Sequence, residues 1–154
     1  EEAVDWEVSD ASQGRYRVRY TATREGRYVI HASVDGVRLS LLPTPQVLPG
    51  STEPSQCTVL GPGLEEAIAG SPAVFIIEAR DTWGNLRHEG GDSFIVQLKN
   101  AESVFLSTHK TIRGMVRYLD NGRYRVTYTP YTAGRHTVFA TFTSGGRAST
   151  FMRR

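Results

Sequence analysis

A repeat with a period of 108 positions is the feature of this sequence that most constrains its fold. The tract Gly14-Arg15-Tyr16-Arg17-Val18-Arg19-Tyr20 recurs as Gly122-Arg123-Tyr124-Arg125-Val126-Thr127-Tyr128, and a further Gly-Arg pair follows each copy. The same 108 positions separate Gly14 from Gly122 and Gly26 from Gly134. This period is too long for one unit of a solenoid and fits a single small domain. The sequence therefore predicts a tandem array of domains.

The length of 154 residues leaves room for one complete copy and part of another. We expect residues 1–42 to be the C-terminal half of a repeat and residues 55–154 to be a complete repeat. Residues 43–54 between them contain four prolines, which predicts an extended, semi-rigid linker. An array cut in this way is expected to be a fragment of a longer protein.

Apolar and polar residues alternate along most of the chain, and Gly, Pro, Asn or Asp interrupts the alternation every ten or so residues. This pattern is typical of antiparallel sheets. In residues 55–154 it predicts seven strands, at 55–60, 73–80, 94–98, 112–118, 124–128, 136–142 and 147–152. In residues 1–42 it predicts strands at 4–8, 16–20, 28–34 and 37–42. Asn121-Gly122 has the residues of a type I′ hairpin turn. The predicted fold class is all-β, an immunoglobulin-like antiparallel β-sandwich of about seven strands.

The same alternation predicts which side chains face the core of the complete repeat. The expected inward residues are Ala73, Phe75, Ile77, Ala79, Phe94, Val96, Leu98, Val116, Tyr118, Tyr124, Val126, Tyr128, His136, Val138, Ala140 and Phe142. In the first copy, Tyr28, Ile30, Ala32 and Val34 have the corresponding phase.

Composition and charge argue against nucleic-acid and membrane partners. The net charge is only +2, and the arginines alternate with other residues along strands, so we expect them to form a solvated strand face. No apolar run approaches the roughly 20 residues that span a bilayer. Cys57 is the sole cysteine and no Asn-x-Ser/Thr sequon occurs, which favours a reducing, cytoplasmic compartment.

We predict no catalytic residues, no metal site and no cofactor. The four histidines lack the spacing of zinc ligands, and no serine lies in a Gly-x-Ser-x-Gly turn. Cys57 is expected to be a small core residue rather than a nucleophile. Asp81, Asn85 and Asp92 could supply oxygen ligands to calcium, but the carboxylates are sparse, so we expect them to cap turns.

Several motifs occur together in the order of one known family. They are Cys57-Thr58-Val59-Leu60-Gly61-Pro62-Gly63-Leu64, Ala69-Gly70, the segment 81–85, Gly90-Gly91-Asp92-Ser93-Phe94, the segment 120–130 and Ala133-Gly134. With them the chain resembles the filamin-type immunoglobulin-like repeat, over most of 55–152, while 4–42 resemble its closing half. The sequence departs from the family at His136, where an aromatic residue is usual, and in a longer segment at 100–111.

The resemblance implies a binding mode, in which a partner peptide adds as a strand beside the third strand and fills a groove between the third and fourth. Carried onto this sequence, the groove would be lined by Ser93, Ile95, Gln97, Arg113, Met115 and Arg117. An alternative is that Val104-Phe105-Leu106 folds over this edge and seals it. Trp83 and Leu86 form a second candidate surface, although Trp83 could equally cap the core.

The sequence thus predicts a non-enzymatic scaffolding module of a tandem filamin-like array. Its expected partners are cytoskeletal or axonemal proteins and the neighbouring repeats of its own chain, in the cytoplasm or the cilium. The alternatives are a repeat of an extracellular or cell-surface adhesion protein, and an accessory domain that positions a catalytic neighbour.

Overall fold

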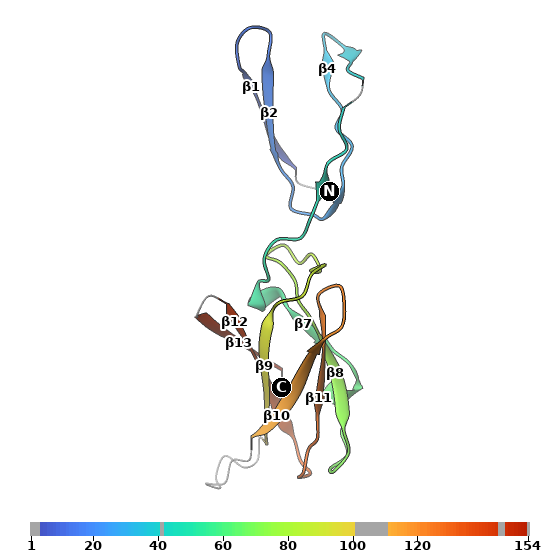
Figure 1. Cartoon of the computed structure of the whole chain (residues 1–154), viewed down its shortest axis with the longest axis vertical. Helices are drawn as coiled ribbons and strands as arrows, with labels where there is room; N and C mark the ends of the chain where they lie inside the picture. Colours follow the sequence, from blue (N-terminus) through green and yellow to red (C-terminus); the bar gives the residue numbers. More distant parts are fainter. Residues whose placement is uncertain (1–3, 41, 101–110, 145–146, 154) are drawn as a thin grey trace. The chain divides into compact units, whose positions relative to one another are not determined.

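The computed structural model describes residues 4–40, 42–100, 111–144 and 147–153 (Figure 1). The chain divides into two compact units, Glu1–Pro49 and Gly50–Arg154, here called unit 1 and unit 2. Unit 2 thus begins inside the segment 43–54 that was predicted to be a linker. No helix in these described ranges is long and apolar enough to cross a membrane.

Hydrogen bonds explain why unit 2 begins at Gly50. The Gly50 amide donates to Asp81 Oδ2 at 2.9 Å, and Arg87 Nη1 donates to the Gly50 carbonyl. The amide of Glu53 donates to the carbonyl of Arg80 at 2.8 Å. These bonds join residues 50–53 to the loop after the second strand of unit 2.

The described residues of unit 2 form seven strands and two short 3-10 helices (Figure 1). In chain order they are η1 (Pro54–Gln56), β7 (Thr58–Leu60), η2 (Pro62–Leu64), β8 (Ala73–Glu78), β9 (Ser93–Asn100), β10 (Ile112–Tyr118), β11 (Arg123–Tyr128), β12 (His136–Ser144) and β13 (Arg147–Arg153). The seven predicted strands are therefore present. The expected start of the first strand at 55 is wrong, because Pro54 opens a helical turn there and Glu53 Oε1 caps it by accepting from the Ser55 amide.

All neighbouring strands of unit 2 are antiparallel, in the order β13-β12-β9-β10-β11-β8-β7. The hydrogen-bonded order runs without a break, so this single sheet curls into two facing layers. One layer contains β13, β12 and β9, and the other contains β11, β8 and β7. Strand β10 joins them, because its first half pairs with β9 and its second half pairs with β11. The all-β immunoglobulin-like fold predicted from the sequence is confirmed.

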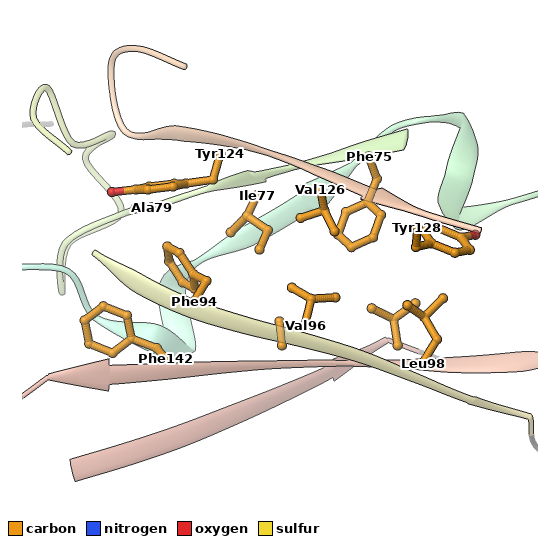
Figure 2. Packing of buried hydrophobic residues seen from close by; sticks show 12 residues of the cluster. Phe75, Ile77, Ala79, Phe94, Val96, Leu98, Tyr124, Val126, Tyr128 and Phe142 are labelled. Carbon is orange, nitrogen blue, oxygen red and sulfur yellow. The ribbon is translucent and has the colours of Figure 1, made fainter. Parts of the chain in front are cut away.

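The core lies between these two layers (Figure 2). Phe75, Ile77, Tyr124 and Val126 point from β8 and β11 toward Phe94, Val96, Leu98 and Phe142, which come from β9 and β12. Phe94 packs edge-to-face on Tyr124 with ring centroids 4.9 Å apart. Most predicted inward residues are buried, because regular antiparallel pairing keeps the two-residue phase over each whole strand.

Four predicted inward residues of unit 2 are less buried than expected, and two of these, Ala73 and Val116, are half-buried. Tyr118 is 39% exposed, since β10 has left β9 at this point; its ring lies beside Tyr124 and Gly90. His136 is half-buried, with Nδ1 lying 3.0 Å from the carbonyl oxygen of Gly134.

Unit 1 is built from short antiparallel pairs. A hairpin of β1 (Asp5–Asp10) and β2 (Tyr16–Thr21) is followed by two-residue pairs of β3 (Gly26–Arg27) with β6 (Gln46–Val47) and of β4 (Ser33–Val34) with β5 (Val37–Arg38). The continuous strand predicted at 28–34 is therefore wrong, as is most of the strand predicted at 37–42. In unit 2 the equivalent strand β12 pairs with β9 along eight residues, and the described part of unit 1 contains no counterpart of β9.

Candidate functional site

Strands β9 and β10 are paired at one end of their common boundary and separate at the other. Ile112, Arg113 and Gly114 pair with Leu98, Gln97 and Val96. From Met115 to Tyr118, β10 pairs with β11 instead. Over Ser93–Ile95, β9 pairs with β12 alone, so its other backbone edge has no strand beside it among the described residues. The open stretch of edge is therefore about three residues long.

Gly114 is the residue at which β10 crosses from one layer to the other. A Cβ placed on Gly114 would lie 2.7 Å from Val126 Cγ1 and 3.0 Å from Val96 Cγ1. These separations are shorter than van der Waals contact, so a side chain here would push against both layers of the core. The crossing thus depends on glycine at this position.

A shallow hollow of about 370 Å³ lies where the two strands diverge. It is lined by Gly91, Asp92, Ser93, Phe94, Val116, Tyr118 and Tyr124. Apolar and aromatic side chains therefore lie next to the unpaired edge of β9. This combination of free backbone groups and apolar surface is the one that an added peptide strand requires.

Two polar side chains of the hollow, Asp92 and Tyr124, are hydrogen-bonded to each other. Tyr124 Oη accepts from the Asp92 amide and donates to Asp92 Oδ2, each at 3.0 Å, and Thr52 Oγ1 donates to Asp92 Oδ1 at 2.8 Å. Burial, together with the charge of Asp92, raises the pKa of Tyr124 to about 12. Tyr124 is therefore a neutral phenol at physiological pH and holds Asp92 in place.

Only some of the six predicted groove residues lie near the open edge of β9. Gln97 and Arg113 are direct backbone partners, so no strand can enter between them. Ser93 lines the hollow, and the side chains of Ile95 and Met115 are 54% and 75% exposed on the strands that flank it. Arg117 is exposed on β10 and pairs with Arg125 of β11. The segment 104–106, which was considered as a cover for this edge, lies outside the described residues.

Sequence reasoning missed the hollow itself. Phe94, Val116, Tyr118 and Tyr124 were assigned to the core, yet all four line the hollow. Their alternation gives the correct face of each strand, but it cannot show that two strands separate. The only local signal was Gly114, a glycine inside a predicted strand, which commonly marks a bend or a close backbone approach.

The second candidate surface is the loop after β8. Trp83 is 58% exposed, and Leu86 is half-buried and bridged to Arg80. Asp81 is 1% exposed and holds the loop: Oδ1 accepts from the amides of Trp83 and Asn85, and Oδ2 accepts from Asn85 Nδ2 and the Gly50 amide. Burial favours a higher pKa for Asp81, but these hydrogen bonds outweigh it and lower the pKa. Asp81 thus caps the turn, as expected.

The remaining candidate groups lie apart. Asp92 is hydrogen-bonded to Tyr124 and Thr52, and Asp81 to Asn85, Trp83 and Gly50, so the side chains considered as calcium ligands have separate hydrogen-bond partners. Cys57 is half-buried against the core, and burial raises the pKa of its thiol. Among the described ranges there is no group of three or more His, Cys, Asp or Glu side chains arranged to hold a metal ion.

An immunoglobulin-like sandwich with a partly open strand edge defines a class of protein, the protein-interaction module. The family model for the filamin/ABP280 repeat matches residues 51–146, which is more than half of the chain. The chain belongs to the filamin repeat family. The fold and the family are those of structural rather than catalytic domains.

Two relatives are long proteins of different kinds. The alpha chain of the flagellar outer-arm dynein of Chlamydomonas reinhardtii is 36% identical over 97 residues, which cover 62% of this chain and 2% of the dynein chain. Filamin-C of Rattus norvegicus is 26% identical over 139 residues, covering 90% of this chain and 4% of filamin-C. The chain thus spans only a few per cent of the length of these relatives. A solved Lin-41 filamin domain matches with a TM-score of 0.46 at 16% identity, over 66% of this chain and 94% of that domain.

Proposed function

We propose that unit 2 is a docking link in a tandem array of filamin repeats on the cytoskeleton, where it captures partner peptides by strand addition. The observation that carries this proposal is the edge of β9 over Ser93–Ile95, which pairs with β12 on one side and has no described strand on the other. A peptide laid along this edge would form main-chain hydrogen bonds with it and extend the β12–β9 sheet by one strand.

Selectivity would come from the side chains around the edge. Ile95 is exposed beside it, and Val116 and Tyr118 offer apolar surface in the hollow. Because β10 closes the edge from Val96 onward, the partner would form main-chain contacts over a short stretch only. We therefore expect modest affinity from one repeat, strengthened when several repeats of an array engage one partner.

The cytoskeletal setting is supported by two relatives of different kinds, a filamin and a flagellar dynein chain. Both are long chains, of which the present sequence covers a small share. We therefore infer that the partners are cytoskeletal proteins, with the ciliary axoneme as the first setting to test.

The test is affinity capture from lysates of ciliated cells, with the 1–154 chain as bait and mass spectrometry as the readout. An Ile95→Glu variant places a charge beside the free edge of β9. Its matched control is Ile68→Glu, because Ile68 is also exposed, at 75%, and lies in unit 2 outside every strand. Cytoskeletal or axonemal proteins recovered with the wild type and with Ile68→Glu, but lost with Ile95→Glu, are the expected result.

Equal recovery by all three baits would contradict docking at β9. Recovery of membrane ectodomains alone would contradict the cytoskeletal setting. Hydrogen exchange of a recovered complex then locates the contact, since strand addition predicts slowed amide exchange within Ser93–Ile95.

A further inference from the structure

The outward face of β11 and β8, with the half of β10 that pairs with β11, carries arginines next to aliphatic residues. Cross-strand pairing aligns Arg117 with Arg125, Arg125 with Ile76, and Ile76 with Leu60. The next row aligns Met115, Thr127 and Val74. We call the set Leu60, Val74, Ile76, Met115, Arg117 and Arg125 the arginine–aliphatic face, and we include Arg113, which shares the outward phase of Met115 on β10 but pairs with Gln97 of β9.

The arginines of this face lack anionic partners. Arg117 and Arg125 lie directly opposite each other, an arrangement of like charges that destabilises a sheet. Among the described residues, Arg113, Arg117 and Arg125 form no side-chain hydrogen bond or ion pair, and all three are exposed. The face therefore carries a positive charge that nothing in the described chain neutralises.

The one carboxylate on the outward side of these strands is already occupied. Glu78 Oε2 lies 2.7 Å from Arg80 Nη2, and Glu78 Oε1 lies 3.1 Å from Arg123 Nε. Burial opposes ionisation of Glu78, but the hydrogen bonds from Arg80 and Arg123 prevail and lower its pKa. Glu78 is thus ionised and held by Arg80 and Arg123, at the end of the face away from Arg113.

The preceding copy of the repeat does not carry this excess of unpaired arginines. At the positions 108 residues earlier, Arg113, Met115 and Arg117 are replaced by Asp5, Glu7 and Ser9. In that hairpin Glu7 lies opposite Arg19, and Ser9 lies opposite Arg17. At these matched positions, unit 1 places an acidic or a neutral residue opposite each arginine, whereas unit 2 places two arginines opposite each other.

The aliphatic part of the face is also accessible. Met115 is 75% exposed and Leu60 is 47% exposed, while Val74 and Ile76 are half-buried between them and the arginines. Arginine and methionine are enriched at protein interfaces, and methionine adapts to varied partners. No aromatic residue occupies the outward positions of β7, β8, β10 and β11, so the face lacks the stacking platform of single-strand nucleic-acid binders.

We propose that the arginine–aliphatic face binds an acidic peptide segment of a protein partner, one in which Glu or Asp residues alternate with apolar ones. The carboxylates pair with Arg113, Arg117 and Arg125, and the apolar residues cover Met115, Ile76 and Leu60. This site uses the surface of the sheet and not the edge of β9, so it stands independently of strand addition.

Fluorescence anisotropy of a fluorescein-labelled peptide of repeated Glu-Glu-Leu units, titrated with the 1–154 chain, tests the proposal. The expected result is saturable binding that weakens as salt rises, and that is absent for a Gln-Gln-Leu peptide of the same length. An Arg117→Glu variant should weaken binding about tenfold or more, because it replaces attraction by repulsion directly beside Arg125. Arg135→Glu changes an exposed arginine outside the face and should leave binding within about twofold of the wild type.

A second readout separates loss of binding from loss of fold. Arg117→Glu places a carboxylate opposite Arg125 and removes the like-charge pair, so its thermal midpoint should stay the same or rise. Equal peptide binding by Arg117→Glu and the wild type overturns the proposal. So does equal binding of the Gln-Gln-Leu peptide, or tighter binding of a single-stranded DNA oligonucleotide than of the acidic peptide.

Discussion

The two hairpins β1–β2 and β10–β11 share a sequence motif and register, but their side chains have opposite exposures. Tyr16 and Val18 of unit 1 are 67% and 54% exposed, whereas their counterparts Tyr124 and Val126 are 3% and 0% exposed. Pairing is the same in both, since Val8 lies opposite Val18 as Val116 lies opposite Val126. The difference is the second layer, because β9 and β12 cover the hairpin of unit 2.

This comparison shows which part of the fold a motif determines by itself. The local sequence is enough to form a hairpin with one apolar face, since alternation and a turn set the pairing. Burial of that face requires strands from elsewhere in the repeat. An uncovered hairpin gains little hydrophobic stabilisation, so we expect unit 2 to contribute nearly all of the free energy of unfolding of this chain.

The largest expected difference between the units comes from truncating matched tyrosines. Tyr128→Ala removes a buried ring that packs on Phe75 and donates to the carbonyl of Gly63, so it should cost about 3 to 5 kcal/mol. Tyr20→Ala, at the equivalent position, should change the free energy of unfolding by less than about 0.5 kcal/mol. Urea unfolding followed by circular dichroism measures both, and similar costs would refute the comparison.

A smaller effect is expected where β10 crosses between layers. Gly114→Ala introduces a Cβ against Val96 and Val126 and should cost about 1 to 3 kcal/mol through overpacking. The equivalent residue of unit 1 is Trp6, whose side chain is 69% exposed, so Trp6→Ala should be close to neutral. Thermal unfolding of both variants checks this, and a Gly114→Ala midpoint at or above that of the wild type would show that the core accommodates the extra carbon.

The smallest effect concerns one hydroxyl. Tyr124→Phe loses the hydrogen bonds with Asp92 and should cost about 1 kcal/mol at neutral pH, whereas Tyr16→Phe should cost nothing measurable, because Tyr16 is largely exposed.

The cost of Tyr124→Phe should also depend on pH. Burial raises the pKa of Tyr124 from 10.0 to about 12, so the folded state holds this proton more tightly than the unfolded state. The stabilisation of the folded state that Tyr124 contributes through this proton is fully present below pH 10 and is lost as pH rises toward 12. Urea midpoints measured from pH 8 to pH 12 should fall less steeply in Tyr124→Phe than in the wild type. Parallel curves would indicate that other groups control alkaline unfolding.

The sequence predicted those parts of the fold that depend on regular alternation. The strands of unit 2, the core positions Phe75, Val96 and Val126, and the Asn121-Gly122 turn follow from local pattern. Both turn residues have positive φ, 42° and 66°, as a type I′ hairpin requires. A two-residue turn by itself would place Arg117 opposite Val126, whereas Arg117 lies opposite Arg125, so the opposition of the two arginines did not follow from the turn.

The remaining features depend on contacts between distant segments. The strand predicted at 28–34 needs a partner like β9, and the exposure of Tyr118 depends on where β9 and β10 separate. The hydrogen bond between Gly50 and Asp81 joins residues 31 positions apart, and no local sequence pattern predicts it. For the candidate site, the alternation of residues predicted that Ile95 and Met115 face outward, but it could not predict that Gln97 pairs with Arg113.

The attachment of Gly50 has a mechanical consequence for an array under tension. A force pulling on residues before Gly50 would first load the bonds from Gly50 to Asp81 and Arg87 and from Glu53 to Arg80. These bonds anchor the chain just beyond the end of β8, a central strand paired with both β7 and β11. The short strand β7 follows later in the chain and is shielded from the load until they break. Asp81, which accepts the hydrogen bond of the Gly50 amide, would thus help to set the force at which the repeat begins to yield.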